Sequence, residues 1–158
     1  MDLGPLSERP ELFKVAAIKN EVVNVTDGQQ TVVVTVGVNI RLDWSGWVTE
    51  VLDTYYAESA LTTSQYTYYR THVSESGSII GPAEELRPSQ LPFNHIVVRA
   101  SMENDEFYVE LPRIVVGDRA VYELEACLTQ PDSEKKCRDS NVTVYIIERP
   151  NTLGMPIF

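Results

Sequence analysis

The stretch GDRAVYELEAC, residues 117–127, decides the fold of this chain. Asp118, Ala120 and Tyr122 stand at alternate positions in it, where the chain enters a predicted strand. The position two residues after the tyrosine holds Leu124, and the cysteine of the stretch comes three residues later. The stretch therefore indicates a chain that turns a corner and enters a strand whose central position is apolar.

The rest of the chain is also rich in strand signals. Its 158 residues suit one domain with tails, and abundant valine, threonine and tyrosine with regular Gly/Pro punctuation favour strands. The clearest strand is Val38–Trp44, where apolar and polar residues alternate strictly. Further strands are predicted over residues 13–18, 21–25, 30–36, 66–73, 79–80, 95–101, 106–111, 121–128 and 141–148.

The connections between these strands vary in clarity. Asp27-Gly28 is a turn signal, and residues 102–105 read as hairpin punctuation. Residues 47–56 fit either a short helix or a strand, whereas the proline-bearing stretch 82–93 reads as an irregular connection. Strands at regular spacing with short connections predict an all-β sandwich.

Charge and sequence motifs limit the surroundings in which the chain works. The net charge of -10 argues against nucleic acid and against acidic membrane surfaces as partners. No apolar run is long enough to cross a bilayer, and the first residues do not form a signal peptide. Asn24-Val-Thr and Asn141-Val-Thr are glycosylation sequons. We therefore expect an extracellular ectodomain fragment that makes no direct membrane contact.

Residue patterns for catalysis are weak. His72 and His95 have no serine or cysteine at a recognisable nucleophile position, and the acidic stretch 103–106 lacks the ligand spacing of a calcium loop. Two cysteines and two distant histidines do not give a zinc spacing, and a phosphate-binding glycine loop is missing. We expect a protein that is not an enzyme and needs neither metal nor cofactor.

Asp118, Ala120 and Tyr122 resemble the corner motif of immunoglobulin V-type domains. Apolar residues nine, seven and four positions before the aspartate also fit that family, and these are Val109, Leu111 and Ile114. The resemblance implies that Tyr122 folds back at the corner and that its hydroxyl satisfies an upstream backbone group. It also implies that Asp118 pairs with an arginine, for which the candidates are Arg99, preferred, and Arg87.

The stretch Gly37-x-x-Ile40-x-Leu42-x-Trp44 is similar to strand B of the same family. Trp44 stands where strand B usually has its cysteine, and Leu124 takes the opposing position. The resemblance thus implies an apolar contact between Trp44 and Leu124 in place of the disulfide between the two sheets. Tyr68 stands where strand C usually has a tryptophan, and the interval from Trp44 to Tyr68 is unusually long.

These features predict an immunoglobulin-like, V-set-like Greek-key sandwich over residues 12–149, with tails at 1–11 and 150–158. A fibronectin type III domain competes, because Ile40-x-Leu42-x-Trp44 and Tyr122-x-Leu124-x-Ala126 also fit that family. Cys127 and Cys137 bracket nine residues, so a disulfide between them closes the loop between strands F and G. Two free thiols are the alternative.

Binding to another protein is the function that this resemblance implies. Tyrosines crowd the region of Trp47, and exposed tyrosine is favoured at interfaces. The predicted binding face comprises the loop 128–136 and five side chains, Tyr66, Tyr68, Arg70, Glu123 and Glu125. The chain is similar to the outer domains of cnidarian allorecognition receptors, which implies cell-surface adhesion with homophilic binding as one option. The alternatives are a secreted viral or parasite decoy and a carbohydrate-binding or enzyme-accessory module.

Overall fold

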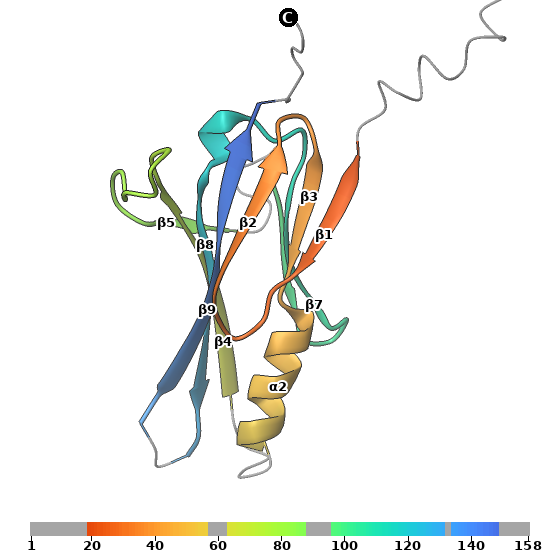
Figure 1. Ribbon diagram of the computed structural model, residues 1–158. Helices are drawn as coiled ribbons and strands as arrows, with labels where there is room; N and C mark the ends of the chain where they lie inside the picture. The colour runs from red at the N-terminus through yellow and green to blue at the C-terminus, as the bar shows by residue number, and fades with distance from the viewer. Residues whose placement is uncertain (1–18, 57–62, 88–95, 132–133, 149–158) are drawn as a thin grey trace, which may run out of the picture.

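The computed structural model describes residues 19–56, 63–87, 96–131 and 134–148, and shows two β-sheets packed face to face with one helix at one end (Figure 1). The strands run from Asn20 to Ile147. The predicted strand 13–18, His95 and the predicted domain limits at 12 and 149 lie outside the described residues. The all-β expectation is confirmed by this two-layer arrangement.

The first sheet has four strands in the order β1-β3-β7-β6. Their bounds are β1 (Asn20–Asn24), β3 (Asn39–Asp43), β7 (Glu106–Leu111) and β6 (Val97–Ser101). The predicted hairpin between β6 and β7 is confirmed, because Ser101 pairs with Glu106 in an antiparallel register. Asp105 supports the turn with a φ of 55°, a left-handed conformation that aspartate tolerates.

The second sheet has five strands in the order β2-β9-β8-β4-β5. Their bounds are β2 (Gly28–Thr35), β9 (Lys136–Ile147), β8 (Ala120–Thr129), β4 (Thr63–His72) and β5 (Glu84–Leu86), and the short 3-10 helix η2 (Val116–Asp118) leads into β8. The irregular connection predicted over 82–93 was wrong at β5. This strand is only three residues long, and flanking prolines hid it.

The strand order gives the fold its name. β1, β3, β7 and β6 follow the order A-B-E-D, while β9, β8, β4 and β5 follow G-F-C-C′, which is the V-type arrangement. The domain is therefore an immunoglobulin-like sandwich. β1 departs from the pattern because it pairs with β3 in parallel. The Asp27-Gly28 turn is present, but β1 and β2 leave it into different sheets, so it does not form a hairpin.

The helix explains the long interval between Trp44 and Tyr68. α2 (Ser45–Tyr56) follows β3 directly, and an Asp43 carboxylate oxygen accepts the backbone N–H of Ser45 at 2.8 Å at its start. Trp47, Val48 and Val51 bury the inner side of the helix. The helical alternative for this region is the one that the structure shows, and it places a helix at the end of the sandwich where β3 ends.

The core is aromatic and aliphatic at the position where V-type domains have their disulfide. Trp44 and Leu124 are both fully buried in one cluster with Ile40 and Leu42. The indole Nε1 donates to the carbonyl of Ser140 at 3.2 Å, so its polar atom is satisfied. Its ring meets Tyr68 edge-on at 5.4 Å, and Tyr68 in turn pairs across the sheet with Leu124. Trp44 thus links the two sheets by packing.

The corner before β8 has the predicted form. The hydroxyl of Tyr122 donates to the carbonyl of Asp118 at 2.6 Å, and both the ring and Ala120 are fully buried. Among the described residues, Asp118 forms no ion pair with either candidate, Arg99 or Arg87, and Arg87 pairs with Glu85. A carboxylate oxygen of Asp118 instead accepts the N–H of Val115 at 2.9 Å. Arg99 is exposed on β6, where it pairs with Tyr108 of β7 and faces away from the core.

Candidate functional site

The register of β4 corrects the predicted binding face. Tyr68 is opposite the buried Leu124, and Tyr66 and Arg70 lie two residues to either side of it. Because side chains alternate along a strand, all three point into the sandwich. The prediction that these three residues share a face with Glu123 and Glu125 is therefore wrong. The outward residues of β4 are instead Thr67, Tyr69 and Thr71.

The two inward tyrosines hold the sheets together. The ring of Tyr66 packs on Phe107 of the facing sheet, with 4.7 Å between ring centroids. The hydroxyl of Tyr68 donates to the carbonyl of Arg99 at 2.7 Å, again across the sandwich. Burial, followed by the negative charge of Asp43, raises the pKa of Tyr68, so this hydroxyl stays a neutral donor. Both residues thus contribute to the fold.

Arg70 is a buried cation with a structural partner. Its guanidinium forms an ion pair with Glu84 of β5 at 2.7 Å, and the same carboxylate lies 3.3 Å from His72 Nε2. Burial raises the pKa of Tyr122, and the nearby positive charge of Arg70 opposes that rise. Glu84 is half-buried, and its ion pair with Arg70 holds β5 against β4.

The outward side chains of β4, β8 and β9 form one continuous surface, which we call the GFC face. Glu123 lies between Tyr69 of β4 and Asn141 of β9, and Glu125 lies between Thr67 and Asp139. The face is defined by the outward residues of the three strands: Thr67, Tyr69, Thr71, Glu123, Glu125, Asp139, Asn141 and Thr143. Glu123 and Glu125 thus lie on this face as predicted, whereas the sequence prediction did not include Tyr69 and Asp139. If Tyr68 is assigned to the core, the alternation of side chains along the strand places Tyr69 on the outer face.

The carboxylates of this face interact with one another. A hydrogen bond with Asp139, partial burial and the negative charges of Asp139 and Glu125 raise the pKa of Glu123 to about 7. At lower pH Glu123 therefore carries a proton that it shares with Asp139, and at higher pH like charges stand side by side. The face becomes more negative as the pH rises through this range.

A disulfide fixes one end of the face. Cys127 and Cys137 are bonded, and they are direct partners in the β8–β9 register. The predicted disulfide is therefore present, and it joins the strands just before the loop that connects them. One group of potential metal ligands occurs among the described residues, and it consists of Glu125 with these two cysteines. Since both sulfurs are in the disulfide, neither offers a thiolate to a metal.

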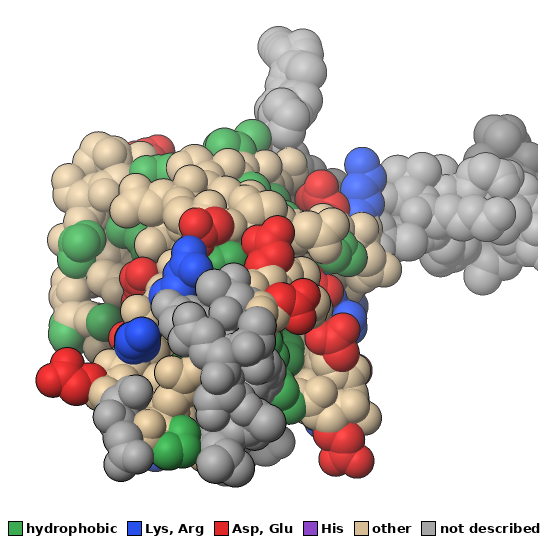
Figure 2. All heavy atoms as spheres, turned by 90° about the horizontal axis from the view of Figure 1, so that it is seen from below, with side chains coloured by type: hydrophobic (Ala, Val, Ile, Leu, Met, Phe, Trp, Pro, Cys, Tyr) green, Lys and Arg blue, Asp and Glu red, His purple; other side chains and the backbone are tan. Residues whose placement is uncertain are grey.

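The helix and the β8–β9 hairpin share one end of the molecule (Figure 1). The carboxylate of Asp27 accepts the indole N–H of Trp47 at 3.0 Å and lies 3.5 Å from Arg138. These residues border an open hollow of about 380 Å³, which Glu50 and Asp53 also line. Figure 2 shows this end of the molecule, where acidic and basic side chains are intermingled on the visible surface.

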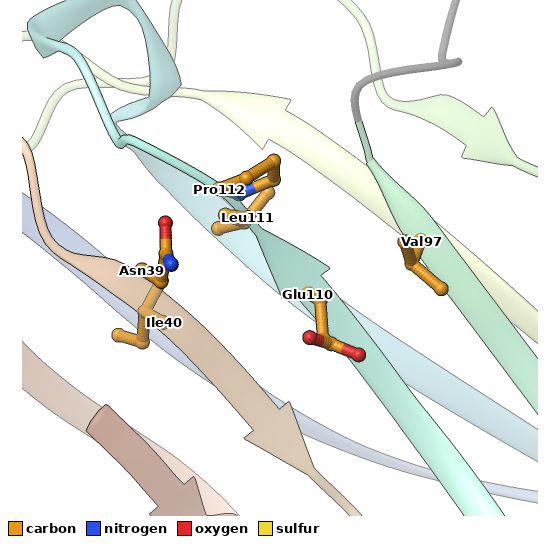
Figure 3. Close-up of a pocket in the computed structure, with 6 residues that line it drawn as sticks. All are labelled: Asn39, Ile40, Val97, Glu110, Leu111 and Pro112. Carbon is orange, nitrogen blue, oxygen red and sulfur yellow. The ribbon is translucent and has the colours of Figure 1, made fainter. Parts of the chain in front are cut away.

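A second hollow lies on the four-stranded sheet. Residues of β3, β6 and β7 line it, among them Asn39, Val97 and Glu110 (Figure 3). Its volume of about 70 Å³ is far below the roughly 300 Å³ of a typical small-molecule site. This hollow therefore does not suit an organic ligand.

The two sequons occupy different surroundings. Asn24 is exposed at the end of the edge strand β1. Asn141 is half-buried on β9, within the GFC face and directly beside Glu123 of β8. A group attached to either side-chain amide would extend over the surface to which that side chain points. The two positions therefore differ in what an attached group would cover.

No family model matches the chain, and no curated protein matches it. Among solved structures the chain is similar to murine CRIg, at 11% identity over 75% of this chain and 92% of the other, with a TM-score of 0.49. Within the described residues, we find no helix with the length and hydropathy of a membrane span.

Proposed function

We propose that this domain is an extracellular recognition module that binds another protein through its GFC face. The observation that carries the proposal is the position of Tyr69. It lies on a central stretch of β4 with its side chain outward, between Glu123 of β8 and Glu85 of β5. A half-exposed aromatic ring flanked by carboxylates offers contact area together with charge.

The surroundings of Tyr69 favour binding because they are already ordered. Ten residue pairs join β4 to β8, and nine join β8 to β9, so the face is held on a continuous ladder. The Cys127–Cys137 bond ties its hairpin end. A surface that is ordered before binding loses little conformational entropy when a partner arrives. The charges favour a partner that presents Arg or Lys around an apolar spot.

A second copy of this chain, on an opposing cell, is the partner that we propose first. The net charge of -10 makes two copies repel one another at long range. The hairpin, however, carries Lys135, Lys136 and Arg138, within a few residues of Glu125 and Asp139. In a two-fold arrangement each basic hairpin can meet the acidic face of the other copy. Such self-association of the allorecognition type would weaken as salt is added.

Analytical ultracentrifugation over a range of protein concentrations tests this proposal. We expect the wild-type domain to self-associate. Tyr69→Ala and Glu125→Lys should each weaken this association at least about tenfold, or about 1.4 kcal/mol. Glu21→Lys is the matched control, because Glu21 is exposed on β1 of the other sheet. A strict monomer up to about 1 mM, a concentration that would reveal binding as weak as about -4 kcal/mol, rejects homophilic binding.

A heterophilic partner keeps the same face but changes the probe. In that case, beads that carry the wild-type domain capture a protein from cell-surface extracts, and beads with Tyr69→Ala capture much less. Binding to a glycan array that ignores Tyr69→Ala would instead favour the carbohydrate-binding alternative.

A further inference from the structure

We propose that Asn141 carries an N-linked glycan that covers the GFC face and thereby controls its binding. The inference rests on the proposed function for its effect on binding, while the attachment and the coverage can be tested without a partner. Three features of the structure support it: the direction of Asn141, the state of its side-chain amide, and its distance from Tyr69.

The strand geometry places the whole sequon suitably. Val142 is fully buried, and so Asn141 and Thr143 on either side of it both point outward. The middle residue of the sequon is not proline, as attachment requires. The acceptor amide and the hydroxyl needed for recognition therefore lie on the same exposed side of β9.

The side-chain amide of Asn141 is free to be modified. It makes no hydrogen bond to any described residue. Asn39 provides the contrast, because its amide donates to Asn20 at 2.9 Å and its oxygen accepts the N–H of Arg113 at 2.8 Å. A sugar on Asn141 would thus break no interaction of the folded domain, and the modified chain can fold as the unmodified one does.

The distance to Tyr69 is short for an oligosaccharide. Asn141 is directly opposite Glu123, and Glu123 is directly opposite Tyr69. Two strand spacings, or about 10 Å, therefore separate Asn141 from Tyr69. Gln29 of β2 lies opposite Asn141 on its other side, so sugars also extend over that strand. A branched glycan of several sugars covers the centre of the face.

Asn24 provides an internal control. It lies on β1, in the other sheet, and is exposed at that sheet's edge. A glycan on Asn24 leaves the GFC face open. Removing the glycan from Asn141 should therefore uncover the face, whereas removing it from Asn24 should leave the face unchanged, which makes the proposal specific to Asn141.

The test begins with the chain secreted from animal cells behind an added signal sequence. Enzymatic glycan removal in heavy-oxygen water, followed by mass spectrometry, measures how much of Asn141 and Asn24 is modified. Hydroxyl-radical footprinting then compares the glycosylated and the deglycosylated protein. We expect Asn141 to be occupied and Tyr69 to be labelled at least about threefold faster once the glycan is removed, with the labelling of Met102, exposed on the β6–β7 turn, unchanged.

The same samples separate this inference from the proposed function. If Asn141 is unmodified in the secreted protein, or if Tyr69 is labelled equally in both forms, the inference is overturned. If the glycan covers Tyr69 and Asn141→Gln increases self-association in the ultracentrifuge whereas Asn24→Gln does not, both proposals are supported. If the glycan covers Tyr69 but neither form of the protein associates, the coverage stands and homophilic binding fails. Asn141→Asp and Thr143→Ala, which also remove the sequon, guard against an effect of the Gln side chain.

Discussion

The two sides of β4 have opposite roles, although their residues are neighbours in sequence. On the inner side, Tyr66 and Tyr68 contact the facing sheet through Phe107 and the carbonyl of Arg99. On the outer side, Thr67 and Tyr69 stand among the carboxylates of the GFC face. Because the side-chain period is two, a shift of one residue exchanges these roles completely. If the outer side binds a partner as proposed, recognition and stability are separated in this strand by the alternation of side chains and not by distance.

The largest effect is expected on the inner side, where Trp44 fills the position of a disulfide. Trp44→Ala removes a fully buried ring, its edge contact with Tyr68 and its hydrogen bond to Ser140. We expect a loss of about 3–5 kcal/mol in the free energy of unfolding, measured with urea. Trp44→Phe should keep a folded protein with a smaller loss. A cost below about 1 kcal/mol for the alanine variant would show that the core does not depend on this indole.

The disulfide comes next, because it links the strands of the face itself. Replacing both Cys127 and Cys137 by serine removes the cross-link that closes the short β8–β9 hairpin. Loop-closure entropy gives a loss of about 2–3 kcal/mol. Thermal unfolding of the double variant measures the loss, and reduction of the wild type should lower its midpoint similarly. Equal midpoints in the oxidised and reduced protein would contradict the estimate.

A single hydroxyl at the corner should have a smaller effect. Tyr122→Phe keeps the buried ring and removes the hydrogen bond to the carbonyl of Asp118. The expected loss is about 1 kcal/mol, the usual net value of one such bond. Tyr145→Phe is the control, because the Tyr145 hydroxyl makes no hydrogen bond to any described residue. Chemical unfolding should rank the two variants in this order, and the reverse order would contradict the role of the corner.

The smallest effect belongs to the outer side and depends on pH. The pKa of Glu123, about 7 in the fold, exceeds the ordinary value of 4.5, so the folded state binds this proton more tightly than the unfolded state. Its contribution to stability is present at low pH and is lost as the pH rises through about 7. Solvent screening limits the change to less than about 1 kcal/mol, since the group is only partly buried.

Glu123→Gln should remove this pH dependence, which the difference between wild type and variant isolates from other titrating groups. Unfolding measured at about pH 5.5 and about pH 8 gives the comparison. Identical pH profiles for the two proteins would show that Glu123 and Asp139 do not share a proton.

Much of the fold could be predicted from the sequence, because local patterns determine it. The strict alternation from Val38 to Trp44 gives a strand, and the spacing of Asp118, Ala120 and Tyr122 gives a corner. The parallel pairing of β1 could not be predicted, since it depends on which edge is left open after β3 and β7 have paired. The sequence also left α2 ambiguous, because the apolar residues of 47–56 fit both the helical period of 3.6 and the strand period of two.

The candidate site was harder to predict than the fold. The alternating glutamates of β8 and the two cysteines indicated the correct sheet and hairpin. The tyrosines of β4 misled the prediction, because tyrosine serves equally well in a core and on a surface. Asp139 and Asn141 join the face only through the β8–β9 register, which extends to Leu128 and Lys136. Non-local register is information that a single sequence pattern does not contain.

The most direct test of this division is the free energy of unfolding of two neighbouring variants on β4. Tyr68→Ala removes a buried ring and its hydrogen bond to the Arg99 carbonyl, and should cost about 3–5 kcal/mol. Tyr69→Ala removes an outward ring and should change stability by no more than about 0.5 kcal/mol. Similar losses for the two variants would mean that Tyr69 also belongs to the core, and the GFC face would then lack its central residue.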